Sequence, residues 1–273
     1  MVLLLLTSAA CGRSPEAAPA PPAPAASLLA VSCEPSALVR SSSGWVVGDN
    51  EDEDGLYRFD DAMALQDRPP LATRIEDVEA IAVDGEGLIV VGSHGVTRSG
   101  KVKPERHRVL LADGRVFALA LDGFVEREAV NVEGAAVLGG ELVLGLRAPL
   151  AASHAQLLVV DRGAAAGTIL RTVAVDLGGA GVRELAPFRG GLLVVSGPAA
   201  DRQEPFGLWW LSALDAAPVR LSGSLPSSTE GAWPVNDTTL RVVIDGDGEP
   251  GACREAGRWL DVSFAVAPAP VVP

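Results

Sequence analysis

The sequence is poor in the residues that most often carry catalysis or bind zinc. Only three His and three Cys occur among 273 residues. No Cys-x-x-Cys or Cys/His ligand spacing is present, which argues against a zinc site. No Gly-x-Ser-x-Gly elbow occurs, and His154 has only Ser153 beside it, so a nucleophilic triad is hard to assemble. Two Met and one Tyr stand against a majority of Val, Leu, Ala and Gly, a composition typical of strands and turns.

The charge balance excludes one broad class of partner. The formal net charge is −13 and the sequence pI is about 4.7, so the surface repels phosphate backbones and anionic lipid. We therefore expect no nucleic-acid partner, whereas a cation or a sugar remains compatible. Hydrophobic residues make up 48% of the chain, enough to build a buried core in one large all-β domain or two ordinary ones.

The first residues predict export. Residues 1–10 form an apolar run that is too short for a membrane span, which needs roughly 20 residues. The run ends in small residues before Cys11, as in a bacterial lipobox, although no Lys or Arg precedes it and Ser8 stands where Leu is usual. We predict a signal peptide with lipidation of Cys11 (residues 1–11), a Pro/Ala-rich tether (12–27) and one domain (28–273) in the periplasm or on the outer membrane. An ordinary cleaved signal with an unrelated Cys is the alternative.

An internal repeat predicts the fold. An acidic residue, a short apolar strand, a turn and a second apolar strand recur five times, starting at Glu34, Glu79, Glu133, Glu184 and Glu230. The steps between these residues are 45, 54, 51 and 46, close to the period of four-stranded propeller blades. We predict an all-β, five-bladed β-propeller. A β-sandwich with coincidental spacing and a ring with a sixth blade are the alternatives.

The remaining strands predict how the ring closes. Third strands are expected at residues 56–59, 108–112, 156–161, 207–211 and 259–264, and fourth strands at 72–75, 125–130, 171–176 and 219–223. The last repeat lacks a fourth strand because residues 265–273 are broken by proline. We expect residues 28–33 to pair with the last blade and close the ring.

Two cysteines remain once Cys11 is assigned to the lipid. Cys33 ends the predicted closing strand, and Cys253 lies in a loop of the same blade on the same face. We predict a disulfide between them, which would close a loop of over 200 residues. Two buried, unpaired thiols are the alternative.

Polar residues should gather at one mouth of the ring. In an antiparallel meander the first strand begins and the second strand ends at the same end of the sheet. We therefore place the candidate ligand-binding residues there, namely Glu79, His94, Glu133, Arg147, Arg183 and Glu230. Acid/base catalysis by these carboxylates with His94 competes with a structural role, in which each carboxylate caps backbone amides.

Three charged loops allow more than one interpretation. Asp49 leads a carboxylate-rich loop, and Asp245 and Asp247 lead a second; both could hold calcium, although no complete EF-hand spacing occurs and a solvated acidic loop is favoured. The basic segment 94–108 is an anion site or, the favoured interpretation, a source of salt bridges to the acidic rim.

Several motifs carry a family resemblance. The stretches Gly145-Leu146-Arg147-Ala148-Pro149-Leu150 and Leu177-Gly178-Gly179-Ala180-Gly181-Val182-Arg183-Glu184-Leu185 resemble a bacterial β-propeller family catalogued as a domain of unknown function. That family is similar to the esterase-like phytase propellers, and the resemblance covers residues 28–264. It implies a propeller and phosphoester or sugar-phosphate chemistry, with no catalytic residue to assign.

These observations leave three functions in competition. The first is binding of a small ligand or an envelope protein at the mouth by a monomer. The second is a phytase-like hydrolase that uses calcium held by mouth carboxylates, with His94, Arg147 and Arg183 gripping phosphate. The third is a structural protein of the cell envelope.

Overall fold

The strands form five antiparallel sheets arranged in a ring. The computed structural model describes residues 27–122, 129–163, 166–200, 205–221, 225–249 and 252–265. In the first four blades the strands follow one another from the centre outward. Blade 1 is β2 (Pro35–Ser41), β3 (Gly44–Asp49), β4 (Tyr57–Phe59) and β5 (Leu65–Asp67); blade 2 is β6 (Val78–Asp84), β7 (Gly87–Gly92), β8 (Val109–Leu110) and β9 (Val116–Phe117); blade 3 is β10 (Asn131–Leu138), β11 (Glu141–Ala151), β12 (His154–Val160) and β13 (Ile169–Val175); blade 4 is β14 (Gly181–Phe188), β15 (Gly191–Gly197), β16 (Gly207–Leu211) and β17 (Val219–Arg220).

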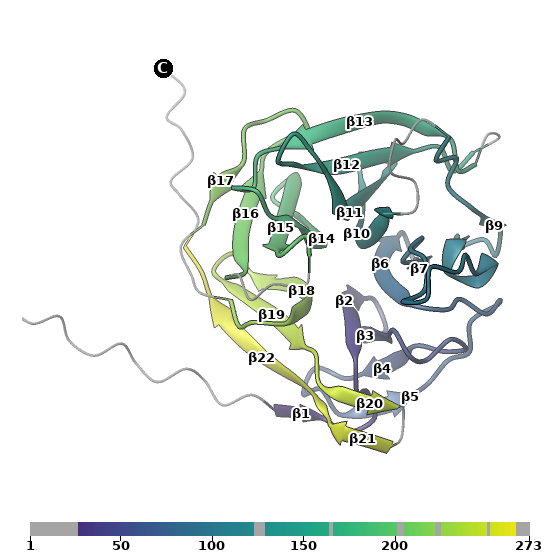
Figure 1. Ribbon diagram of the computed structural model, residues 1–273. Coiled ribbons are helices and arrows are strands. Elements are labelled where there is room, and N and C mark those ends of the chain that lie inside the picture. The colour runs from purple at the N-terminus through teal and green to yellow at the C-terminus, as the bar shows by residue number, and fades with distance from the viewer. Residues whose placement is uncertain are drawn as a thin grey trace, which may run out of the picture.

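The fifth blade is built from both ends of the described chain. It contains β18 (Thr229–Asn236), β19 (Thr239–Ile244), β22 (Gly257–Ser263) and, as its outermost strand, β1 (Ser27–Leu29). β1 pairs antiparallel with β22, with Leu28 opposite Arg258 (Figure 1). The predicted five-bladed ring, closed by the N-terminal strand, is confirmed, although that strand ends at Leu29 and Cys33 follows it in a turn.

Two of the predicted fourth strands are wrong. The outer strands of blades 1 and 2 are β5 and β9, whereas we expected them at residues 72–75 and 125–130. Residues 72–75 lie in the crossover to blade 2, where Ile75 is fully buried between the blades. An apolar residue buried from a loop gives the same sequence signal as one in a strand. Residues 123–128 lie outside the described part of the chain.

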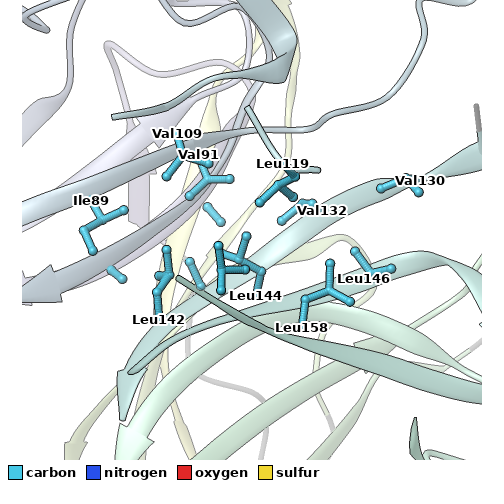
Figure 2. Close-up of a cluster of buried hydrophobic side chains, with 14 of the residues drawn as sticks. Ile89, Val91, Val109, Leu119, Val130, Val132, Leu142, Leu144, Leu146 and Leu158 are labelled. Carbon is cyan, nitrogen blue, oxygen red and sulfur yellow. The ribbon is translucent and has the colours of Figure 1, made fainter. Parts of the chain in front are cut away.

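The core consists of five separate clusters, one at each boundary between blades. Side chains alternate between the two faces of a strand, so each sheet serves two clusters. On β15, for example, Leu192 and Val194 face blade 3, whereas Leu193 and Val195 face blade 5. Figure 2 shows the cluster between blades 2 and 3, where Ile89 and Val91 pack against Leu142 and Leu144. Because both faces of every blade are covered, the middle strands are apolar almost throughout.

Two elements lie outside the five sheets. The 3-10 helix η1 (Pro104–His107) precedes β8, and the two-stranded hairpin of β20 (Asp247–Glu249) and β21 (Ala252–Glu255) extends from the fifth blade. Within the described ranges no helix is long and apolar enough to cross a bilayer.

Candidate functional site

Each inner strand contains a β-bulge near its start. The register shifts between Pro35 and Ala37, Val78 and Ala80, Val132 and Gly134, Val182 and Glu184, and Thr229 and Gly231. A bulge re-aims the side chain of the residue that drops out of the pairing. In each blade one residue drops out of the strand pairing at the bulge. These residues are Ser36, Glu79, Glu133, Arg183 and Glu230.

These five residues meet in one cavity in the central channel, which we call the channel cavity. Its volume is about 250 Å³ and all but one of its lining residues are polar or charged. The inner strands β2, β6, β10, β14 and β18 surround the centre of the ring in Figure 1, each packed against its two neighbours. The lining residues are Glu34, Pro35, Ser36, Asn50, Glu79, Glu133, Arg147, Arg183, Glu230 and Asp245.

Arg183 and Glu133 form the centre of an ion-pair network in this cavity. Arg183 Nη1 lies 2.8 Å from Glu133 Oε2, and its Nη2 donates to Glu230 Oε1. Arg147 Nη1 donates to Glu133 Oε1 over 3.1 Å, and its Nε donates to the carbonyl of Pro198. The side chains of Arg183 and Glu133 are 8% and 4% exposed, so the charges in this network are largely removed from water.

Carboxyl groups outnumber guanidinium groups in the channel cavity. Five acidic residues and two Arg line it. Among the described residues, neither Glu79 nor Asp245 has an ion-pair partner. Burial, with the nearby Glu133, Asp77 and Glu230, raises the pKa of Glu79 well above its usual value. Burial, with Glu34, raises the pKa of Asp245 to about 7. Burial also raises the pKa of Glu230, against the opposing effect of Arg183.

These raised pKa values predict how stability depends on pH. The folded protein holds protons on these carboxyls that the unfolded chain releases, so the stability they contribute is present below about pH 4 and is lost as pH rises through about 7. We expect the Tm to fall by about 2–4 °C between pH 5.5 and pH 8, measured by circular dichroism. Asp245→Asn should flatten that slope, whereas exposed Glu86→Gln should keep it. Equal slopes in wild type and Asp245→Asn would contradict the assignment.

Glu34 and Glu184 do not occupy the positions that the repeat predicts. The residues equivalent to Glu79 are Ser36 in blade 1 and Arg183 in blade 4. Glu34 still lines the channel cavity, but Glu184 is 1% exposed and does not. Its Oε1 accepts a hydrogen bond from the amide of Leu185, and its carboxyl also contacts the amides of Leu38 and Ala232. The alternative in which a carboxylate caps backbone amides therefore describes Glu184.

A signal for the correct alignment was present in the sequence. A Gly or Ala follows the bulged residue in four blades, as Ala37, Ala80, Gly134 and Gly231. At Gly231 a Cβ would lie 2.6 Å from the amide nitrogen of Leu38, so the neighbouring inner strand leaves no room for a side chain. Aligning on this small residue finds Ser36, which aligning on acidic residues misses. Asn50, in the turn after β3, also lines the channel cavity, but no feature of the sequence pointed to it.

Asp49 has a structural environment rather than that of a metal ligand. Its side chain is fully buried. Oδ2 accepts hydrogen bonds from Ser32 Oγ (2.8 Å), the amide of Cys33 (2.9 Å) and the amide of Glu34 (3.2 Å), and Oδ1 accepts one from Glu51 N (3.0 Å). Asp245 lies in the channel cavity instead, and Asp247 begins β20. No group of three or more His, Cys, Asp or Glu among the described residues has a metal-binding arrangement.

His94 lies away from the channel cavity. It is 1% exposed, its Nδ1 is 2.9 Å from the carbonyl of Gly92, and the amide of Leu119 approaches its Nε2 at 3.4 Å. Burial lowers its pKa to about 4, so the ring is neutral at physiological pH. It therefore does not join the carboxylates as an acid/base partner.

The basic segment makes the salt bridges that we favoured. Lys103 Nζ and Arg106 Nε both bind Glu76, and Arg106 Nη1 binds Asp77 at 3.0 Å. The carboxylate loop after β3 is paired as well, because Arg68 binds Asp52 and Arg74 binds Glu53.

The predicted disulfide is confirmed and lies beside the channel cavity. Cys33 and Cys253 are bonded, with their Cα atoms 5.2 Å apart and a sequence separation of 220. The carbonyl of Cys33 accepts a hydrogen bond from Gly246 N over 2.9 Å. Cys33 precedes Glu34 and Gly246 follows Asp245, so the bond holds two lining residues from opposite ends of the chain together.

The fold and the site together define a class of protein: a five-bladed β-propeller that gathers charged side chains from its blades into a central cavity. Residues 125–221, which span blades 3 and 4, match the family described as a protein of unknown function (DUF3616). This match covers about a third of the chain and includes both stretches that carry the resemblance, so the predicted resemblance is confirmed over these residues.

Solved structures resemble this chain at low sequence identity. Glutaminyl cyclase from Myxococcus xanthus is 13% identical with a TM-score of 0.52, over 89% of this chain and 95% of that one. A GH43 β-1,3-galactosidase is 6% identical with a TM-score of 0.50, over 85% and 56%. PQQ-bound aldose sugar dehydrogenase from Streptomyces coelicolor is 14% identical with a TM-score of 0.39, over 90% and 100%. No curated protein sequence matches. The likeness to the first two structures concerns the fold alone.

Proposed function

We propose that this propeller binds a small polar ligand in its channel cavity. The observation that carries the proposal is the convergence of one bulged residue from each blade on a single cavity of about 250 Å³. A scaffold needs no charged residue at its centre, and burying charge costs free energy that apolar residues would save. Five bulges aimed at one point, with a carboxyl group such as that of Glu79 left without an ion-pair partner in the described chain, support recognition of a ligand.

The hydrolase alternative has weaker support. Arg147 and Arg183, which were expected to grip phosphate, are both bound to Glu133, and His94 is buried elsewhere. The oxygens of Asp49 accept hydrogen bonds from four donors and so are poorly placed to coordinate calcium.

A thermal-shift screen tests the proposal. The probes are monosaccharides, amino acids, small amines, phosphate monoesters and calcium chloride, each added to the purified protein. We expect at least one organic probe to raise the Tm by about 2 °C or more, as mass action predicts for a ligand of the folded state. Asn50→Trp, which places an indole at the lining of the cavity, should abolish that shift. No shift with any probe, or calcium-dependent hydrolysis of the phosphate monoesters, would contradict it.

We also propose that the protein is exported and lipid-anchored. The Cys33–Cys253 bond supports export, because disulfides persist in oxidising compartments such as the periplasm. Cys11, the predicted site of lipidation, lies outside the described residues. We expect cells that express the protein to incorporate labelled palmitate into it, and Cys11→Ser to remove the label. Equal labelling of both forms would contradict a lipid on Cys11.

A further inference from the structure

The charges of the channel cavity do not balance. Its lining contains five carboxyl groups and two guanidinium groups, so the lining itself carries more negative than positive charge when every group is ionised. Both guanidinium groups are already engaged by carboxylates: Arg147 by Glu133, and Arg183 by Glu133 and Glu230. Pairing therefore leaves Glu79 and Asp245 without a cation in the described part of the chain. Asp245 Oδ1 is also buried and accepts no hydrogen bond from the described residues.

The size and lining of the channel cavity restrict which ligand can supply a positive charge to Glu79 and Asp245. About 250 Å³ admits only a small molecule, since ligand sites for drug-sized compounds are about 300–1,000 Å³. Pro35 is the one apolar residue of the lining, so a large hydrocarbon body would find no partner. Asn50, by contrast, has a buried Oδ1 that accepts no hydrogen bond from the described residues and can accept one from a hydroxyl group. The hydroxyl of Ser36 already donates to the carbonyl of Val78 but can still accept a hydrogen bond. A Lys side chain of a folded partner would need a protruding segment to reach the centre of the ring.

We infer that the ligand of the channel cavity is a small organic ammonium ion, bound through Glu79 and Asp245. This inference rests on the proposed function and adds the chemical class of the ligand. An ammonium group donates up to three hydrogen bonds, and each bond to a carboxylate is charge-assisted. It would supply the charge that the two Arg do not, without displacing either from Glu133.

Binding of such a ligand should release protons. Glu79 is surrounded by Glu133, Asp77, Glu230 and Arg183, and burial raises its pKa. Asp245 faces Glu34, Asp49 and Arg183, with its pKa raised to about 7. An ammonium ion favours the ionised form of each carboxyl, so its affinity increases with pH from 6 to 8.5. Calorimetry in two amine-free buffers of different ionisation enthalpy measures the protons released.

Three isosteric probes test the class of the ligand. Ethanolamine carries an ammonium and a hydroxyl group, ethylene glycol replaces the ammonium by a second hydroxyl, and glycolate replaces it by a carboxylate. We expect ethanolamine to bind at least ten times more tightly than either of the others, with proton release. Glu79→Gln and Asp245→Asn should each weaken its binding at least tenfold. Glu86→Gln, an exposed change of the same charge in the β6–β7 turn, should leave binding unchanged.

The outcomes separate this inference from the proposed function. If ethylene glycol or glycolate binds as well as ethanolamine, or if only another compound of the screen binds, the ammonium class is wrong and the binding function stands. If calcium chloride binds more tightly than ethanolamine, the channel cavity prefers a metal cation and the inference is wrong. Ethanolamine binding that Glu79→Gln and Asp245→Asn leave unchanged would place the amine elsewhere. If no compound binds, the proposed function fails as well.

The Glu79→Gln variant should fold, which keeps the test decisive. Gln has nearly the shape of Glu and removes a carboxyl whose ionisation is opposed by burial and by Glu133. We therefore expect its Tm at pH 8 to equal or exceed that of the wild type. Lost binding in a folded, stable variant can then be assigned to the lost carboxylate.

Discussion

Replacing Cys33 and Cys253 by Ala lowers the free energy of unfolding by about 3–5 kcal/mol. The bond joins residues 220 apart, and the chain-entropy account gives about 5 kcal/mol for a closed loop of this length. In this account the effect comes from the greater freedom of the unfolded chain once the bond is absent. Urea unfolding of both forms, followed by Trp fluorescence, measures the difference.

Reductant provides the control for this prediction. Dithiothreitol should bring the wild type to the stability of the double variant and should not change the double variant. A difference of less than about 1 kcal/mol would show that the pairing of β1 with β22 closes the ring without help from the disulfide.

Replacing Arg183 by Met should cost about 3–5 kcal/mol, because it leaves two carboxylates buried without their cation. Glu133 and Glu230 both pair with Arg183, and their side chains are 4% and 15% exposed. Burial raises the pKa of Glu230, so this carboxyl takes up a proton at low pH and the variant should recover part of the lost stability near pH 4. The measurement is urea unfolding at pH 4 and at pH 7.5.

Arg171→Met is the matched control for Arg183→Met. Arg171 pairs with Asp215, but their side chains are 41% and 77% exposed, and ion pairs of that kind contribute about 0–1 kcal/mol. A second variant, Arg183→Met with Glu133→Gln and Glu230→Gln, removes the uncompensated charges and should recover stability at pH 7.5. Equal losses in the Arg171 and Arg183 single variants would show that the network is not isolated from water.

Much of the fold could be predicted from the sequence because it depends on periodicity. Inner strands recur at about 50 residues, and the missing strand of the last repeat has a counterpart at the start of the chain. The short outer strands could not be placed, because Ile75 is as apolar as a strand residue although it lies in a crossover. Ile75 is buried because the neighbouring blade covers it, and a short stretch of sequence carries no information about that contact.

The site was predicted in outline, with errors of one or two positions. Glu79, Glu133 and Glu230 are the bulged residues of their blades, as the repeat implied, but Glu184 is displaced by one residue from Arg183. A bulge changes which of two consecutive residues points into the channel. The spacing of the acidic residues in the sequence does not show where each bulge lies. Asp49 ends β3 and His94 lies two residues after β7, but both side chains are buried and hydrogen-bonded elsewhere and do not line the channel cavity.

The pairing of β1 with β22 has a consequence for folding. Ser27–Leu29 and Gly257–Ser263 are separated by more than 200 residues, so the fifth sheet is complete only when these two distant strands meet. Before they meet, β22 has an unpaired edge, and an edge of this kind can pair with a strand of another chain. Late pairing of β1 thus makes the fifth blade the place where we expect misassembly between copies to begin.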